Sequence, residues 1–345
     1  MTVGILSRLI LFGDKRKEEI KSMDKDNNLT KVCNIKPVSS LKEQFKEYCC
    51  TKRTRISTGY LNFDVLLGGG LTDDLYIFGA PTSCGKSAFW MSIAQNISKE
   101  GIKVLYFSLE MSAREHIARG VSFISYDKVR KGDADVAYTA QEILKWKRVQ
   151  ETNEFEQVNY SCFSQFADKY FSEYADNLYI IEGGIGGMTA NRISDMVVEF
   201  CNSNSNEEVV VIVDYLQIIA QPDKVDRKRE MDNIVGVLKN ISMQLEIPVV
   251  CISSIGRNSY GKRVSSGSFK ESGDIEYGGG VCLGFNWCGG TVKADENDKM
   301  LLKQLAREGC RLMELDFLKS RNGENGTRAR FKYHPAFNCF EEIRE

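Results

Sequence analysis

A glycine-containing loop that ends in a lysine and a serine is the feature of the sequence with the clearest chemistry. The apolar run Leu75–Phe78 leads into the loop Gly79–Gly85, and Lys86, Ser87 and an amphipathic stretch follow at once. Such a loop directs successive backbone N–H groups at a phosphate, and the N-terminus of the following helix adds the positive end of its dipole. The spacing is typical of a P-loop and predicts a site for a nucleoside triphosphate.

The residues of this loop have separate expected roles. Lys86 reaches the β- and γ-phosphates, the hydroxyl of Ser87 is a ligand of Mg²⁺, and Gly85 lets the backbone approach the phosphates closely. Ala80 stands where the P-loop pattern usually has its first glycine, with Gly79 just before it, and the strand–loop–helix context supports the assignment. The residues expected to bind the nucleotide are Ala80, Pro81, Thr82, Ser83, Cys84, Gly85, Lys86 and Ser87.

Two acidic residues that follow apolar runs are candidates for the chemistry of hydrolysis. Glu110 comes shortly after Val104–Phe107, where a carboxylate could orient and deprotonate the water that attacks a γ-phosphate. Asp214 ends the run Val209–Val213, and a carboxylate there typically holds the Mg²⁺ shell. Each is weak evidence alone, because a glutamate there is more often a helix cap and many strands end in aspartate. Lys86, Glu110 and Asp214 together, each after an expected strand, indicate hydrolysis of a nucleoside triphosphate with Mg²⁺.

The elements that must position these residues alternate along the chain. The expected strands are Leu75–Phe78, Val104–Phe107, Leu178–Ile181, Val209–Val213, Val249–Ile252, Val281–Phe285, Leu315–Leu318 and Arg328–Tyr333. The expected helices are 86–99, 112–124, 189–201 and 230–246. Continuously apolar strands linked by helices predict an α/β fold with a central, mostly parallel, twisted sheet that helices flank.

Turns and polar stretches complete this outline. The turns Arg321-Asn-Gly and Glu324-Asn-Gly separate the last two expected strands, which predicts an antiparallel C-terminal hairpin. The polar stretches 127–177, 202–207 and 286–312 are the expected long loops or insertions.

Composition excludes several classes of protein. The 345 residues carry a net charge of −1, so any binding to nucleic acid must come from local basic clusters. No apolar run approaches the length of a membrane span, and the short apolar start at residues 1–13 reads as an amphipathic helix, not a secretion signal. The 11 cysteines are scattered, which argues for a reducing compartment, and we expect a cytoplasmic protein with no contact to a membrane.

Several blocks of the sequence resemble one known family. The chain is similar to the DnaB-type replicative helicases from Ile56 to Glu342, with the blocks in the family's order. The matching blocks are STGYLNFDVLLGGGL before the P-loop, FSLEM, VDYLQII, KNISMQLEIPVVCISSIGR, ESGDIE and KSRNGENGTRARFKYHPAFNCFEE.

The resemblance implies a fold, an activity and partners. It implies a RecA-like ATPase domain over residues 55–345 that works in a homohexameric ring, moves on single-stranded DNA and unwinds duplex DNA during replication. A helicase loader or a primase would be further partners. Residues 39–54 would be a linker helix that docks on the adjacent subunit, and residues 1–38 form an N-terminal extension without an assigned role. The family's N-terminal domain has no room in this chain.

Further site residues follow only from the resemblance. The turn that holds Lys319 and Arg321 would contribute both side chains to the γ-phosphate in a neighbouring subunit. A planar, permanently charged guanidinium suits that role. Two basic loops would follow the DNA backbone without reading sequence. Their expected contacts are Lys224, Arg227, Lys228 and Arg229 in the first loop, and Arg257, Lys262, Arg263 and Lys270 in the second.

The chain also departs from the family pattern. Ser254 stands where the family usually has a glutamine that senses the γ-phosphate, and serine is too short for that contact. Tyr277 and the glycines Gly278–Gly280 stand where acidic residues are usual, and Lys270 replaces an arginine. These departures put the coupling of hydrolysis to strand movement in question more than hydrolysis itself.

Two alternatives therefore stay open at the level of sequence. One is a RecA-like or KaiC-like oligomeric switch that hydrolyses ATP without unwinding, which the departures favour. The other is a ring subunit that only binds nucleotide, which an intact Glu110 argues against, because a pure binder has no use for a base.

Overall fold

The computed structural model describes residues 37–43, 45–46, 55–145, 154–183, 187–219, 227–256, 259–269, 278–320 and 327–344. The chain divides into two compact units, Met1–Arg53 and Thr54–Glu345. In the first unit, the 3-10 turn η1 (Val38–Leu41) is followed by helical residues at 42–43 and 45–46, which are described parts of the expected linker helix. Residues 1–36 and 47–54 lie outside the described residues.

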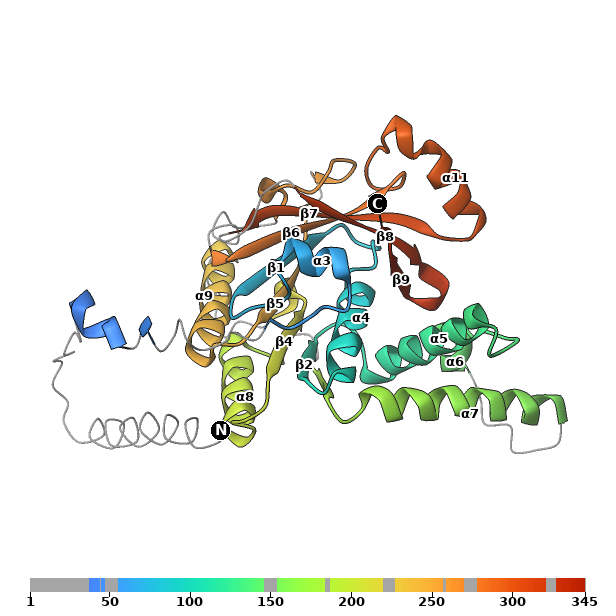
Figure 1. Ribbon diagram of the computed structural model, residues 1–345, viewed down its shortest axis with the longest axis horizontal. Coiled ribbons are helices and arrows are strands. Elements are labelled where there is room, and N and C mark those ends of the chain that lie inside the picture. Colours follow the sequence, from blue (N-terminus) through green and yellow to red (C-terminus); the bar gives the residue numbers. More distant parts are fainter. Residues whose placement is uncertain are drawn as a thin grey trace. The chain divides into compact units, whose positions relative to one another are not determined.

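The second unit is built on one sheet (Figure 1). Within the described ranges it has nine strands in the order β3-β2-β4-β5-β1-β6-β7-β8-β9. The strands are β1 (Leu75–Ala80), β2 (Lys103–Ser108), β3 (Leu178–Glu182), β4 (Val209–Asp214), β5 (Val249–Ser254), β6 (Val281–Cys288), β7 (Arg311–Ser320), β8 (Arg328–His334) and β9 (Cys339–Glu342). Pairing is parallel from β3 to β6 and antiparallel from β6 to β9. The expected mostly parallel sheet with an antiparallel C-terminal hairpin is confirmed.

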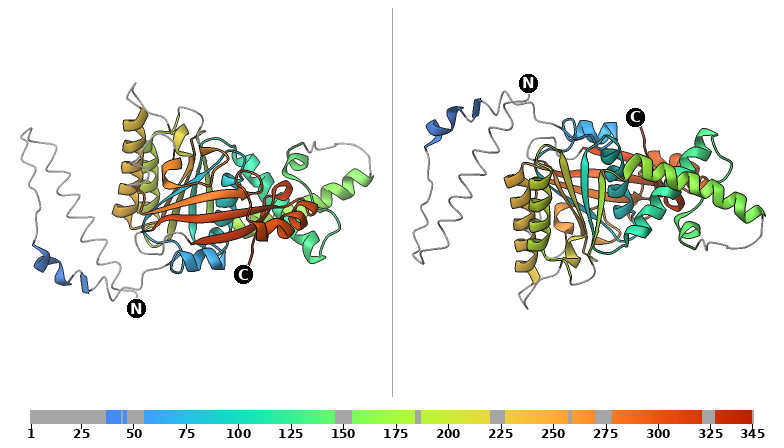
Figure 2. Two further views of the ribbon diagram at one scale, coloured as in Figure 1. Left: turned by 90° about the horizontal axis from the view of Figure 1, so that it is seen from above. Right: turned by 90° about the horizontal axis from the view of Figure 1, so that it is seen from below.

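Helices cover both faces of this sheet because its central strands are apolar throughout. Every residue of β1 and β4 is buried. The helices α3 (Leu61–Leu66) and α4 (Lys86–Lys99) share one apolar core with the C-terminal strands. The helices α8 (Ala190–Ser203) and α9 (Arg227–Leu245) pack into a second core on the other face (Figure 2). A parallel sheet buried on both faces is the result.

Two of the expected loops contain helices instead. The stretch 127–177 continues α5 (Ala113–Lys131) and then holds α6 (Ala140–Lys145) and α7 (Glu154–Tyr174). Its aromatic residues recur at helical spacing and bury a small core of their own, in which Phe166 and Tyr170 pack against α5. Likewise, α11 (Lys299–Arg307) occupies the stretch 286–312 and buries Leu305. The loop prediction at 202–207 is confirmed from Asn204 onward.

None of the helices in the described part of the chain is both long enough and apolar enough to cross a membrane.

Candidate functional site

The carboxyl ends of β1, β2, β4 and β5 meet along one edge of the sheet. In the register of the parallel pairs, Ala80 lies opposite Ser254, and Ser108 lies opposite Asp214. The peptide N–H of Leu109 also donates a 2.8 Å hydrogen bond to the carbonyl of Asp214. The phosphate loop and both candidate carboxylates are therefore brought to one place, where open α/β sheets hold their ligands.

The phosphate loop has a backbone that only particular residues tolerate. Ser83 has a φ of 63° and Gly85 a φ of 83°, both in the left-handed region, and α4 begins directly after at Lys86. A side chain at position 85 would meet Tyr333, whose Cε1 lies 2.9 Å from the place of a Cβ atom. Two features therefore require glycine at position 85: its left-handed φ and the close approach of the Tyr333 ring. A loop with left-handed residues of this kind can direct successive N–H groups at an anion.

Residues from β6, from the turn after β6 and from β7 lie close to the phosphate loop. Arg311 donates a 3.1 Å hydrogen bond to the carbonyl of Ser83, and its guanidinium lies 4.1 Å from the ring centroid of Trp287. The thiol of buried Cys84 lies 3.9 Å from the hydroxyl of Thr291, and burial raises the pKa of that thiol, so it stays neutral at pH 7. These supports come from residues that motif reasoning did not find, since they lie far from the loop in sequence.

Asp214 presents the donor set expected of a Mg²⁺ site. Its side chain is 2% exposed, and Oδ2 accepts a 2.9 Å hydrogen bond from the hydroxyl of Tyr106. The other oxygen, Oδ1, is buried and has no hydrogen-bond partner among the described residues. Burial raises the pKa of Asp214, while Ser87 and Lys86 lie close enough to oppose that rise. A buried carboxylate oxygen without a partner beside a serine hydroxyl fits a hydrated Mg²⁺ ion.

Tyr106 and the residues behind it form a polar group that the sequence did not reveal. Burial raises the pKa of Tyr106 well above its ordinary value, so the phenol remains a donor to Asp214. The ring of Tyr106 packs edge-on against His116 at 5.1 Å, and Nε2 of His116 lies 2.9 Å from the hydroxyl of Ser108. Burial lowers the pKa of His116 to about 3, with a smaller contribution from Arg119, so its imidazole is neutral at pH 7.

Lys86 and Glu110 both influence the charge of Asp214. The ammonium of Lys86 is 5.1 Å from the ring centroid of Tyr215. Leu109, the residue before Glu110, donates its N–H to the carbonyl of Asp214, the residue before Tyr215. Burial raises the pKa of Tyr215, and the charge of Glu110 is the next cause of that rise. Glu110 itself is exposed to solvent. Lys86, Glu110 and Asp214 therefore lie at the same edge of the sheet, and the side chain of Glu110 is open to solvent.

Gln217 links the chain that follows β4 to the end of β5. Gln217, in the short helix η2 (Leu216–Ile218), accepts a 3.1 Å hydrogen bond from the N–H of Ser254. Its amide nitrogen donates to the carbonyl of Ser254 at 3.2 Å and to the hydroxyl of Ser253 at 2.9 Å. Gln217 therefore fixes the end of β5.

One of the three glycines that depart from the family pattern is required by packing. Gly280 is buried at the start of β6, and its N–H donates a 3.0 Å hydrogen bond to the carbonyl of Leu75. A Cβ at this position would collide with the carboxylate of Asp74, which forms an ion pair with Lys239. Only glycine fits beside that pair.

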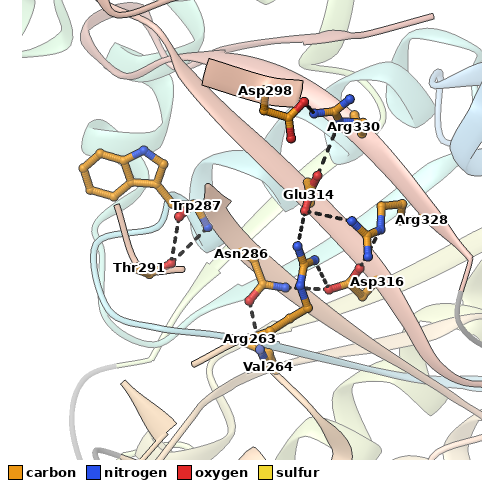
Figure 3. A network of polar contacts seen from close by, with 10 residues as sticks. All are labelled: Arg263, Val264, Asn286, Trp287, Thr291, Asp298, Glu314, Asp316, Arg328 and Arg330. Carbon is orange, nitrogen blue, oxygen red and sulfur yellow. Dashed lines mark hydrogen bonds and ion pairs between the residues drawn. The ribbon is translucent and has the colours of Figure 1, made fainter. Parts of the chain in front are cut away.

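The basic residues expected to contact DNA or a neighbour fall into different settings. Lys224, Arg257, Lys270 and Arg321 lie outside the described residues, as does Tyr277. Arg227 and Lys228 lie in α9 and their side chains are not described, whereas Arg229 and Lys262 are exposed. Lys319 donates a 3.1 Å hydrogen bond to the carbonyl of Gly279. Arg263 is held in an ion-pair network by Glu314 and Asp316 (Figure 3).

Comparison with known proteins agrees with this geometry. The family described as DnaB-like helicase C terminal domain matches residues 55–342. The replicative DNA helicase DnaB of Pasteurella multocida is 27% identical over 300 residues, which are 85% of this chain and 56% of that relative. The same helicase of Haemophilus influenzae is 27% identical over 301 residues, with the same two shares. The chain thus spans about half the length of the relatives it matches.

Solved structures show the same fold. A structure whose title describes an ATPase domain matches with a TM-score of 0.68 at 20% identity, over 89% of this chain and 98% of that chain. A second, titled "The Structure Of A DnaB-Like Replicative Helicase And Its Interactions With Primase", matches with a TM-score of 0.69 at 19% identity, over 99% of this chain and 75% of that chain. The RecA-like arrangement expected from the sequence is confirmed.

Proposed function

We propose that this chain, which belongs to the family of DnaB-like helicase C-terminal domains, is the ATP-hydrolysing motor of a replicative DNA helicase. In this proposal it forms a homohexameric ring, uses Mg²⁺, moves on single-stranded DNA and displaces the partner strand. The observation that carries the proposal is the convergence of Lys86, Glu110 and a buried Asp214 with an unpartnered oxygen at one edge of the sheet, among the residues that the structure describes.

Each residue of the site has a step in the hydrolysis of ATP. The backbone N–H groups from Thr82 to Ser87 and the ammonium of Lys86 hold the β- and γ-phosphates. Ser87 and Asp214 would hold Mg²⁺, which supplies charge neutralisation on the phosphate oxygens. Glu110 takes a proton from the water whose oxygen bonds to the γ-phosphorus, and the bond from that phosphorus to the bridging oxygen breaks. ADP and inorganic phosphate are the products.

The ring completes the site in this proposal. Lys319 and Arg321 of one subunit approach the γ-phosphate bound by the next, where a fixed positive charge stabilises the transferring phosphoryl group. Lys319 lies near the end of β7, two positions before Arg321 in the sequence. Residues 39–54 act as the linker that docks on the adjacent subunit, residues 55–345 form the ATPase domain, and residues 1–38 are an extension.

DNA would pass the two basic loops after β4 and β5. Arg229 and Lys262 are exposed and available to phosphates. The other contacts in this proposal are Lys224, Arg227, Lys228, Arg257 and Lys270. Primase is a proposed partner because one related structure is described with primase, and a helicase loader is a second one. A cytoplasmic location is part of the same proposal.

The decisive experiment is strand displacement on a forked duplex with ATP and Mg²⁺. We expect displacement together with an ATPase rate that rises when single-stranded DNA is added. The second candidate function, an oligomeric ATPase switch, is favoured by the short side chain of Ser254. It predicts hydrolysis without displacement and a rate that ignores single-stranded DNA, and that result would replace the helicase proposal.

A further inference from the structure

The segment from Ser259 to Phe269 lies against the phosphate loop. The hydroxyl of Tyr260 is 3.2 Å from Oγ1 of Thr82, in the exposed part of the phosphate loop. At the other end, Phe269 bridges to Ile255 and packs so closely on Gly79 that a Cβ there would lie 2.5 Å from its ring. One basic loop therefore touches the nucleotide loop directly, through a hydroxyl pair.

Arg263 fastens the same segment to strand β7 (Figure 3). Its guanidinium donates to Oδ2 of Asp316 at 2.7 Å and to Oε2 of Glu314 at 2.6 Å. The next residue, Val264, donates its N–H to Oδ1 of Asn286 at 2.9 Å, and the amide of Asn286 donates to Asp316 at 2.8 Å. Three hydrogen bonds thus link two consecutive residues of the loop with β6 and β7.

The charges around Arg263 oppose its release to a DNA phosphate. The Glu314 side chain is 2% exposed and that of Asp316 is 10% exposed, and their contacts with Arg328, at 3.4 Å, are longer than those with Arg263. Departure of Arg263 would remove the shortest ion pair of each of these two carboxylates. Taking a partner away from a buried charge is costly, because the remaining charge is left in a medium of low dielectric.

We propose that Arg263 is a positioning residue that anchors this loop to β7 and so holds Tyr260 on Thr82, and that the Tyr260–Thr82 pair carries the state of the phosphate loop to the DNA-binding loop. This contact would replace the γ-phosphate contact that the side chain of Ser254 is too short to make. Arg263 is then an internal anchor and not a DNA contact, in contrast to its exposed neighbour Lys262. The inference rests on the proposed function, since it needs a chain that binds both nucleotide and DNA.

The experiment measures how far nucleotide changes the affinity for DNA. The affinity of the full chain for a labelled oligo(dT) is titrated with a non-hydrolysable ATP analogue and Mg²⁺, and without nucleotide, over a range of salt. The ratio of the two affinities is the coupling factor, which is roughly 5 to 150 for linked sites. We expect R263A, E314Q and Y260F to bring this ratio close to one, and R263K to restore part of it, because lysine pairs with one carboxylate at a time.

Lys262 supplies the matched control. K262A should keep the coupling factor and lower the slope of log affinity against log salt by about 0.7, the value for one phosphate contact on a single strand. R263A should leave that slope unchanged. If Arg263 binds DNA directly, R263A lowers the slope and E314Q, which releases the guanidinium, tightens DNA binding, and the proposal is overturned.

The remaining outcomes are also decisive. A wild-type coupling factor in Y260F overturns the route through Thr82, as does a wild-type chain whose DNA affinity ignores nucleotide. If thermal unfolding shows that R263A does not fold, Y260F decides, because it removes one exposed hydroxyl. A wild-type chain that binds no DNA refutes the proposed function itself, whereas nucleotide-dependent DNA binding that survives in all variants refutes only this inference.

Discussion

The hydroxyl of Tyr106, on β2, donates a 2.9 Å hydrogen bond to Oδ2 of Asp214, on the neighbouring strand β4. This bond satisfies one oxygen of the buried carboxylate and leaves the other, Oδ1, without a partner among the described residues. It orients the oxygen that we assign to the Mg²⁺ shell, because a carboxylate fixed on one side presents the other at a defined angle.

Replacing Tyr106 with phenylalanine tests this orientation. Y106F leaves the Oδ2 oxygen buried without a donor, which costs about 1–3 kcal/mol. We expect weaker use of Mg²⁺, with a concentration for half-maximal ATPase raised roughly 10-fold or more. Y179F, which removes an exposed tyrosine hydroxyl from β3, is the control and should behave as wild type. An unchanged Mg²⁺ titration in Y106F would show that the bond does not orient the site.

Lys86 should be indispensable for turnover. We expect K86A to lower the ATPase rate roughly 100-fold or more, because it removes a cation from the transferring phosphoryl group. Forked-duplex displacement should be lost in parallel. K99A, at the exposed end of the same helix, controls for the effect of losing a lysine from α4. Robust hydrolysis by K86A would contradict the phosphate site.

Glu110 should separate binding from chemistry. E110Q keeps the size and polarity of the side chain but removes the base, so we expect a loss of about 10²–10⁴ in turnover with nucleotide affinity retained. Turnover comes from a phosphate-release assay and affinity from a fluorescent ATP analogue. E199Q, at an exposed position of α8, is the matched change. Equal turnover in E110Q and wild type would assign the base elsewhere.

The close contact at Gly280 predicts that an alanine destabilises the protein there more than at Gly267. G280A should lower the free energy of unfolding by about 1–3 kcal/mol, because its Cβ meets the Asp74 carboxylate in a packed interior. G267A is the control, since a Cβ there has no neighbour within 4 Å, and it should change stability by less than about 0.5 kcal/mol. Urea unfolding measures both. Equal effects would leave Gly280 without a packing role.

Burial of neutral His116 predicts acid sensitivity. Its pKa is lowered by burial to about 3 in the folded chain, whereas an unfolded histidine titrates near pH ~6.5. Between these values the unfolded chain binds a proton that the folded chain does not, so stability falls as pH falls from about 6.5 toward 3. The contribution is about 1.4 kcal/mol per pH unit. H116Q should lose this part of the slope in urea unfolding at about pH 7 and pH 5, and an identical slope would argue against a neutral His116.

Many of the strands, and the position of the phosphate loop, could be predicted from local sequence patterns. The strands β1, β2, β4 and β5 are apolar runs, and the P-loop spacing predicted where the phosphates bind. The helices in 127–177 and 286–312 were missed because their polar composition masked aromatic and leucine residues at helical spacing. Chain order and periodicity carry this information, because a strand or a helix is decided mainly by its own residues.

Contacts between distant residues were decided by tertiary structure alone. The sequence determined that Lys86, Glu110 and Asp214 each follow a strand. Only the sheet order placed Tyr106 beside Asp214 and set Arg311 against Ser83. It also set the guanidinium of Arg263 against Glu314 and Asp316. The physical reason is that a side chain's partner depends on which strands become neighbours and which faces they bury, and neither leaves a local mark in the chain.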